Sequence, residues 1–179
     1  MRSDTRRYRP GVRSAMLVTA LGAVCAAVLP GLAGAADGPI LPREAYVRRA
    51  DAVCLDVAKK ALALQREARR LVAAAGSDAE VRRILGRVYR DQLTLVRRMR
   101  LRITAIGLPR GVTAARVATR LVAGIRTGER ALQDVIAATD GASVPAFQRA
   151  VARYRAVSLE SARAVRRSGL GFRYCGAGA

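Results

Sequence analysis

The chain has 179 residues, which fits a single domain, and it carries 33 Lys and Arg against 13 Asp and Glu, for a formal net charge of +20. It contains no histidine, so the commonest general base and a common metal and haem ligand are missing. It also lacks the Cys-x-x-Cys-His motif of covalent haem, the His-Glu-x-x-His motif of zinc proteases and a Gly-rich phosphate loop. We therefore expect no enzyme, with no catalytic residues, no cofactor, no metal and no small-molecule substrate.

The N-terminal segment has the three regions of a secretory signal peptide in their usual order. Residues 1–14 hold five arginines and a single acid. No charged residue follows over 15–36, and this uncharged stretch ends in the small residues that a signal peptidase accepts. We predict that residues 1–35 are a signal peptide cut after Ala35, so that the protein is secreted or extracytoplasmic.

The competing interpretation of this segment is a retained membrane anchor. Its uncharged span is near the ~20 residues needed to cross a bilayer, but Pro30 and Gly34 interrupt its second half. A twin-arginine signal at Arg6-Arg7 and a lipidated Cys25 fit less well, because the neighbouring residues are of the wrong type. Membrane contact is therefore expected only if the N-terminal segment is retained.

Four stretches of helical periodicity follow a short linker over residues 36–42. Gly and Pro residues separate them, and no stretch shows the alternation typical of strands. Four helices joined by short connections predict an all-α fold, an antiparallel up-down four-helix bundle. The domain is expected over residues 43–179, with helices at about 43–75, 78–106, 113–139 and 144–168.

Local signals set these expected boundaries. Pro42 suits the first turn of a helix. Ser77 with Glu80 forms a capping box for the second helix. Thr113 is the expected N-cap of the third helix, and Ser143 is that of the fourth.

The first helix has a regular apolar seam, at alternating steps of three and four, that predicts packing against other helices. Its members are Val47, Ala50, Cys54, Val57, Ala61, Leu64, Ala68, Leu71 and Ala75. Because a buried methylene contributes about 0.8 kcal/mol, alanine adds little, and we expect a thin core with few aromatic side chains. Gly124 and Gly128 in the third helix are expected to let a neighbouring helix approach closely.

Two cysteines lie outside the N-terminal segment, Cys54 and Cys175. In an up-down bundle the fourth helix ends beside the start of the first, and the tail after Gly169 can turn back to Cys54. An oxidising compartment favours a disulfide between them, and closing so long a loop contributes about 5 kcal/mol on the chain-entropy model. Two free buried thiols and a redox pair remain alternatives, although the Cys-x-x-Cys spacing of a redox pair is absent.

The segments around both cysteines resemble those of small exported actinobacterial helical proteins of unknown function. The similar residues are Ala-Asp-Ala-Val-Cys at 50–54 and Gly-Phe-Arg-Tyr-Cys-Gly at 171–176, with Leu108-Pro109 in mid-chain. The resemblance implies a disulfide-closed helical module and an exported location. It implies no particular activity.

Most acidic residues are expected to pair with arginine or lysine on helix surfaces. The expected pairs are Glu44 with Arg48, Asp56 with Lys60, Glu67 with Arg70, Arg87 with Asp91, and Glu160 with Arg163. Asp51, inside the first cysteine segment, is the one acid with a candidate further role. A structural salt bridge with an arginine is the favoured interpretation of it.

Stripes of arginine are the best candidate for a binding surface. They recur at helical spacing on the second and fourth helices, as Arg83, Arg87, Arg90, Arg97, Arg149, Arg153, Arg163 and Arg167. Because each guanidinium can bind phosphate through two hydrogen bonds, such stripes can bind a polyanion, either wall polymer, anionic lipid or nucleic acid. A solvated helix face is the competing and favoured interpretation, and an Arg- and Ala-rich composition is also typical of GC-rich genomes.

Two functional hypotheses follow from these patterns. In the first, the protein is a non-catalytic exported bundle that interacts with a protein or another component of the cell envelope or extracellular space. In the second, it is an electrostatic binder of polyanions. Salt separates them, because polyanion binding weakens steeply as salt rises, whereas an interface with an apolar centre is far less sensitive.

Overall fold

The computed structural model describes residues 39–141 and 143–176. The predicted signal peptide, residues 1–35, and the alternative membrane anchor both lie outside these described residues. Among the helices within the described ranges, none combines the length and the apolar character that crossing a bilayer requires.

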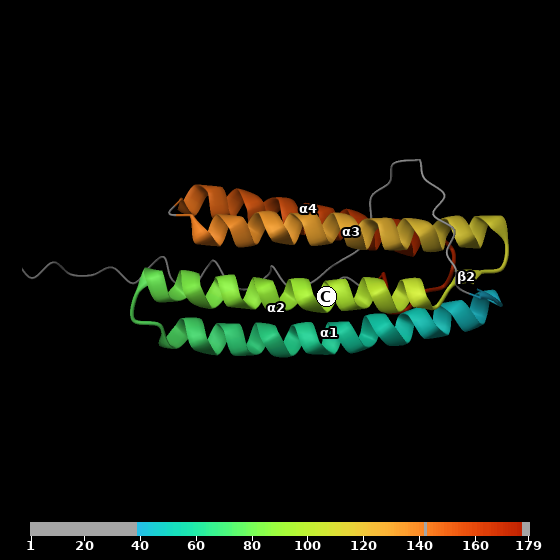
Figure 1. Cartoon of the computed structure of the whole chain (residues 1–179), viewed down its shortest axis with the longest axis horizontal. Coiled ribbons are helices and arrows are strands. Elements are labelled where there is room, and N and C mark those ends of the chain that lie inside the picture. The colour runs from blue at the N-terminus through green and yellow to red at the C-terminus, as the bar shows by residue number, and fades with distance from the viewer. Residues whose placement is uncertain (1–38, 142, 177–179) are drawn as a thin grey trace, which may run out of the picture.

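Four helices make up most of the described chain (Figure 1). They are α1 (Arg43–Ala74), α2 (Asp78–Ala105), α3 (Val112–Asp140) and α4 (Val144–Arg167). The predicted all-α class with four helices is confirmed, and each boundary lies within one residue of its predicted position. Two strands of two residues each, β1 (Ile40–Leu41) and β2 (Leu108–Pro109), complete the elements.

The helix starts follow the local signals with one exception. Ser77 caps α2, its Oγ accepting a hydrogen bond from the backbone N–H of Glu80 at 3.2 Å. The Glu80 carboxylate accepts one from the N–H of Gly76 at 2.9 Å, which completes the capping box one residue further back. Thr113 is not the N-cap of α3: Gly111 holds that position with φ 96°, and no side chain caps the helix. Glycine adopts this left-handed backbone without steric cost, and threonine does not.

Each helix packs against the next one in the chain, α1 on α2, α2 on α3 and α3 on α4. Figure 1 shows the four lying side by side along one long axis. At one end the guanidinium of Arg43, at the start of α1, donates a hydrogen bond to the carbonyl of Gly169, just after α4. The connection between α2 and α3 lies at this same end (Figure 1). Segments far apart in the sequence therefore meet there.

The strand pair differs from the sequence prediction, which is a linker over 36–42. β1 and β2 run parallel to one another. The N–H of Leu108 donates to the carbonyl of Pro39 at 3.2 Å, and that of Arg110 donates to the carbonyl of Leu41 at 2.7 Å. This pairing fastens the segment before α1 onto the connection between α2 and α3.

The core combines small and aromatic side chains. Ala50 and Ala118, on the inner faces of α1 and α3, are fully buried and permit close helix packing. Tyr46, Tyr89 and Tyr154 are also buried and fill the space that the alanines leave. The core therefore depends on aromatic side chains more than the apolar seam predicts.

Some polar side chains of α2 and α4 are buried within this core. The Nε2 of Gln92 donates a hydrogen bond to the hydroxyl of Tyr154 at 2.9 Å, and both residues are buried. Ser158 and Ser161 on α4 are also buried, and neither hydroxyl has a hydrogen-bond partner in the described part of the chain. Because an unpaired buried hydroxyl weakens a fold by roughly 1–3 kcal/mol, these two serines lower the stability of the interior.

Candidate functional site

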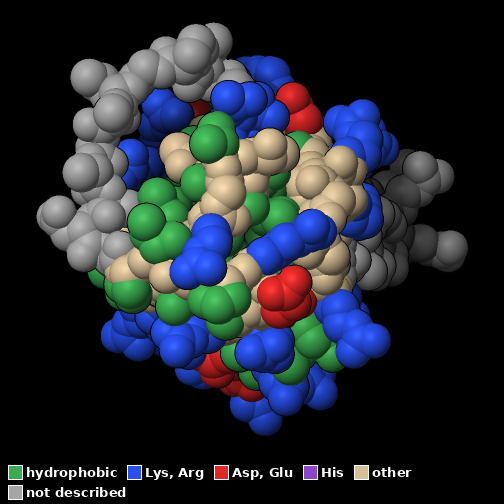
Figure 2. Space-filling model, turned by 90° about the vertical axis from the view of Figure 1, so that its right-hand side faces the viewer, with side chains coloured by type: hydrophobic (Ala, Val, Ile, Leu, Met, Phe, Trp, Pro, Cys, Tyr) green, Lys and Arg blue, Asp and Glu red, His purple; other side chains and the backbone are tan. Residues whose placement is uncertain are grey.

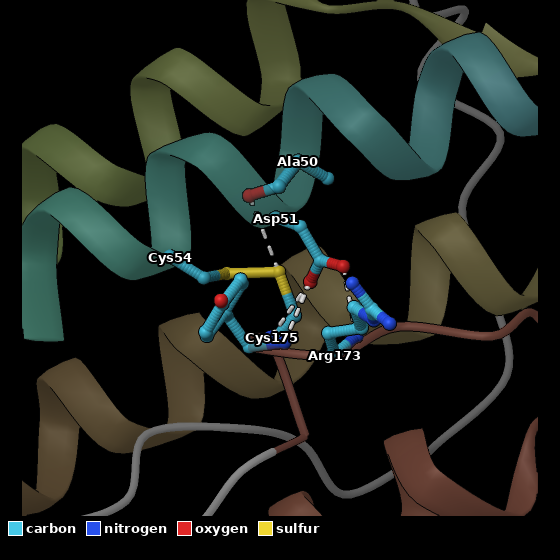
Figure 3. The surroundings of a disulfide bond; sticks show 6 residues. Ala50, Asp51, Cys54, Arg173 and Cys175 are labelled. Carbon is cyan, nitrogen blue, oxygen red and sulfur yellow. Dashed lines mark hydrogen bonds between the residues drawn. A yellow bond between two sulfur atoms is a disulfide. The ribbon is translucent and has the colours of Figure 1, made fainter.

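The two cysteines meet at the end of the bundle where α1 starts. Their sulfurs lie 2.07 Å apart and their Cα atoms 5.2 Å apart, so Cys54 and Cys175 form a disulfide bond across 121 residues of sequence (Figure 3). The predicted pairing is confirmed, and two free thiols are excluded. The bond holds the C-terminal tail, which we define as residues 168–176, against α1.

The carboxylate of Asp51, one turn before Cys54, binds the backbone of the same tail (Figure 3). Its Oδ2 accepts a hydrogen bond from the N–H of Arg173 at 2.7 Å, and its Oδ1 accepts from the N–H groups of Tyr174 and Cys175 at 2.9 and 3.0 Å. The predicted salt bridge with an arginine is wrong, because these partners are three backbone amides. Hydrogen bonds to a charged acceptor are about twice as strong as neutral ones, so Asp51 positions Cys175 beside Cys54.

Glycines allow the tail to lie close to the helices. Gly171 has φ 83°, a conformation that side chains rarely tolerate. A Cβ at Gly176 would come within 3.3 Å of the backbone nitrogen of Arg166, whose side chain donates to the carbonyl of Gly176 at 2.6 Å. Phe172 packs edge-on against Tyr46, with 6.4 Å between ring centroids. Gly171, Phe172, Cys175 and Gly176 therefore take part in closing the bundle through their residue types, whereas Arg173 and Tyr174 contribute backbone N–H groups.

We call the surface around the disulfide the closed end, and define it by residues 39–51, 106–114 and 166–176. These segments contain seven arginines, no lysine and two acids. One of the two acids, Asp51, is already occupied by the tail amides. Figure 2 looks onto this end and shows apolar and neutral surface interspersed with basic side chains, which lie both near the centre and at the periphery. The closed end is therefore strongly positive.

Large apolar side chains are exposed at the closed end. Ile40 is 69% exposed, Val112 is 77% exposed and Tyr174 is 44% exposed. Arg43 and Leu170 both line two shallow hollows, of about 380 and 320 Å³, that open on the same surface. These exposed apolar side chains, together with the arginines beside them in the sequence, make the closed end a candidate binding surface.

The arginine stripes lie on the helix surface, and all eight residues are exposed. Two of them pair with acids of α3: an Nη1 of Arg90 lies 3.8 Å from Asp140, and that of Arg153 lies 3.6 Å from Asp134. Within the described residues the others make no ion pair, and these are Arg83, Arg87, Arg97, Arg149, Arg163 and Arg167. Binding of a polyanion by the stripes stays a prediction.

Two of the five predicted surface pairs are present. Lys60 lies 3.0 Å from Asp56, and Arg70 lies 2.8 Å from Glu67. Asp56 also binds Arg102 of α2 at 2.6 Å, so that it links α1 to α2. The hydrogen bonds from Lys60 and Arg102 lower the pKa of Asp56 below its ordinary value. Asp56 therefore keeps its negative charge in mildly acidic surroundings.

The acids of the other three predicted pairs, Glu44, Asp91 and Glu160, make no ion pair within residues 39–141 and 143–176. An additional pair joins α2 to α3, with Nε of Arg100 lying 2.8 Å from Glu129. Both of its side chains are largely shielded from solvent. This pair is therefore screened by salt less than the exposed ones.

Buried tyrosines account for the other shifted pKa values. Burial raises the pKa of Tyr46 to about 12. It also raises the pKa of Tyr89 to about 12, although the nearby charge of Arg155 opposes the shift. Both hydroxyls therefore stay protonated at neutral pH and belong to the core rather than to a reactive site.

In the described part of the chain, no group of three or more potential ligand residues could hold a metal ion.

A scan against protein-family models and searches of curated proteins and of solved structures found no match to the chain. The resemblance of segments 50–54 and 171–176 to exported actinobacterial proteins therefore stays a prediction.

Proposed function

We propose that the protein is a non-catalytic exported module that binds a protein or another component of the cell envelope or extracellular space through its closed end. The observation that carries this proposal is the exposure of Ile40, Val112 and Tyr174 among seven arginines. Tyrosine and arginine are enriched in protein interfaces, and the closed end exposes Tyr174 together with its seven arginines. Its composition therefore resembles a binding surface more than an ordinary solvated one.

Covalent closure supports this role. Tyr174 lies between two anchors, since Asp51 binds its N–H and the next residue, Cys175, is bonded to Cys54. A surface that is ordered before the partner arrives loses less conformational entropy on binding. The tail is therefore suited to present Tyr174 in a fixed position.

Export and the order of the helices belong to the same proposal. A disulfide persists outside the cytoplasm, which supports an exported protein with a cleaved signal at residues 1–35. Packing of each helix on the next one, through short connections, supports an antiparallel up-down bundle. N-terminal sequencing of the exported protein tests the cleavage, and an intact Met1 in the membrane fraction would contradict it.

Matched substitutions at the two ends of the bundle test the binding surface. Tyr174→Asp changes a closed-end residue that is 44% exposed, and Val144→Asp changes one that is 48% exposed at the start of α4. Native and variant proteins, each tagged, are cross-linked in the intact envelope, and the captured components are compared. We expect Val144→Asp to capture the same partner as the native protein and Tyr174→Asp to lose about tenfold. Equal capture by the two variants would contradict the proposal.

A second candidate function is electrostatic binding of a polyanion through the arginine stripes. Six of the eight stripe arginines make no ion pair in the described part of the chain, which favours it. Retention of the native protein on heparin or on anionic vesicles, measured across a salt gradient, tests it. We expect the elution salt to fall when Arg83, Arg87 and Arg97 are replaced by glutamine, since each lost contact reduces the salt dependence by about one unit. Absence of retention at low salt would eliminate this candidate.

A further inference from the structure

A shallow groove of about 580 Å³ lies on the outer side of α1 and α2, separate from the closed end. Leu64 of α1 and Leu95 of α2 form its apolar floor, and both are half-buried. Ala63 and Thr94 lie beside them and are exposed. The small side chains leave room for atoms of another molecule to reach the two leucines.

Four charged residues form the rim of this groove, Lys60 and Glu67 on α1 and Asp91 and Arg98 on α2. Only residues 75–77 join the two helices, so α1 and α2 form an antiparallel hairpin. The ion pair between Asp56 and Arg102 shows which residues of α1 lie opposite which residues of α2. In this register Lys60 lies opposite Arg98, and Glu67 lies opposite Asp91. One half of the groove is therefore cationic, and the other half is anionic.

We propose that this groove is a self-association surface, and that its occupant is a second copy of the same chain. A two-fold axis that lies in the interface and crosses both helices at right angles sets each helix antiparallel to its copy. It places Arg98 against the partner's Asp91 and Lys60 against the partner's Glu67, and symmetry repeats both contacts. The apolar floors of the two grooves then meet at the axis. Every charge on the rim faces an opposite charge.

Arg98 and Asp91 carry most of the selectivity of this arrangement. Lys60 already binds Asp56 at 3.0 Å, and Glu67 already binds Arg70 at 2.8 Å. Arg98 and Asp91, in contrast, make no ion pair within the described residues. They are therefore free to pair across the axis without breaking a bond inside either copy.

The size of the surface also fits a dimer. α1 and α2 have 32 and 28 residues, so at 1.5 Å per residue they are about 40 Å or more in length. Two helices side by side give a face about 20 Å wide. Such a face has on the order of 800 Å², which is what each partner contributes to a standard interface. At its edges the partner's Arg87 approaches Arg102, whose charge is compensated by Asp56.

Charge reversal tests the proposal on the whole chain, as it is expressed and processed, with its disulfide intact. Sedimentation equilibrium at physiological ionic strength measures the dimer dissociation constant of the native protein, Arg98→Asp, Asp91→Arg and the double variant that exchanges the two. Each single variant puts like charges together at two places, so we expect its dissociation constant to rise about tenfold to a hundredfold. The double variant restores both contacts, and we expect it to return to within about threefold of the native value.

Mixing the two single variants supplies the decisive control. In Arg98→Asp both rim residues of α2, at positions 91 and 98, are acidic, and in Asp91→Arg both are basic. An equimolar mixture should therefore form heterodimers, although neither variant dimerises well alone. Circular dichroism and a free-thiol assay confirm that each variant is folded. A native protein that stays monomeric, or a double variant as weak as the single ones, would overturn the proposal. Tyr174→Asp should dimerise like the native protein, so this test and the closed-end test fail independently.

Discussion

Asp51 shows how one side chain positions the end of the chain. It is buried and accepts hydrogen bonds from three consecutive backbone N–H groups, those of Arg173, Tyr174 and Cys175. The sequence predicts an arginine as the partner of Asp51, whereas the structure gives it three backbone N–H groups. Backbone amides leave no signature in a sequence, whereas arginines are abundant in this one. Only the path of the tail reveals what the carboxylate binds.

We predict that Asp51→Asn lowers the free energy of unfolding by about 3 kcal/mol, because asparagine keeps one acceptor oxygen and turns an NH₂ group toward amide donors. The disulfide should also form more slowly on reoxidation, since the tail no longer holds Cys175 in place. Guanidinium unfolding and a timed thiol assay measure the two effects. Asp134→Asn is the matched control, because Asp134 is exposed and lies 3.6 Å from Arg153, which is also exposed, so its loss should matter far less. Equal losses in both variants would contradict this role for Asp51.

The buried tyrosines predict how stability depends on alkaline pH. Because the folded-state pKa of Tyr46 and of Tyr89 is about 12, above the ordinary value of 10.0, the folded state favours the neutral hydroxyl. Their contribution is therefore complete below pH 10 and is lost as the pH rises from about 10 to about 12. Each tyrosine should account for on the order of 2 kcal/mol. Guanidinium unfolding along a pH series measures this loss, which Tyr46→Phe should reduce; an unchanged pH dependence in that variant would contradict the assignment.

The four helices could be located from the sequence because their boundaries depend on nearby residues. Ser77 and Glu80 lie beside the turn that they stabilise, and their hydrogen bonds are local. The strand pair could not be predicted, because its bonds join Pro39 to Leu108 and Leu41 to Arg110, and two residues carry no periodicity. The cysteine pairing could be predicted, since only two cysteines follow the N-terminal segment. The charge pattern of the groove could not be predicted, because the sequence alone does not show that Lys60 lies opposite Arg98. That placement follows only from the register of the α1–α2 hairpin.

On the inner face of α4, we predict that Ser161→Ala raises the free energy of unfolding by about 1 kcal/mol. The Oγ of Ser161 is fully buried without a partner in the described part of the chain. Removing it takes away an unpaired polar group, and alanine also favours the helix. Ser168→Ala is the control, because Ser168 Oγ donates to the carbonyl of Val165 at 2.6 Å and accepts from the N–H of Leu170 at 3.3 Å. That variant should be destabilised in the same unfolding experiment. A loss of stability in both variants would contradict the prediction.

For the whole molecule, we predict that replacing Cys54 and Cys175 by serine lowers the free energy of unfolding by about 5 kcal/mol on the chain-entropy model. The effect is large because the bond closes a loop of 121 residues. Thermal unfolding of the native protein with and without reductant should show the same difference as the double variant. A variant as stable as the oxidised native protein would show that helix packing alone closes the bundle.

The two proposed surfaces have a joint consequence if both tests succeed. The groove lies on the sides of α1 and α2, whereas the closed end lies at the tip of the bundle. An antiparallel dimer would therefore place its two closed ends at opposite tips, each free to bind. If the partner offered two binding sites that the two tips could reach at once, the dimer would bind it with a higher overall affinity than a single closed end would.

The pairing of β1 with β2 decides where the polypeptide enters the domain. Pro39 is fixed beside Leu108 through its carbonyl, at the closed end with its seven arginines. Any upstream sequence that stayed attached would therefore leave the domain at the closed end. If that upstream sequence were held in a lipid bilayer, the guanidinium groups of the closed end would face the phosphate headgroups. The long axis of the bundle would then be perpendicular to the membrane.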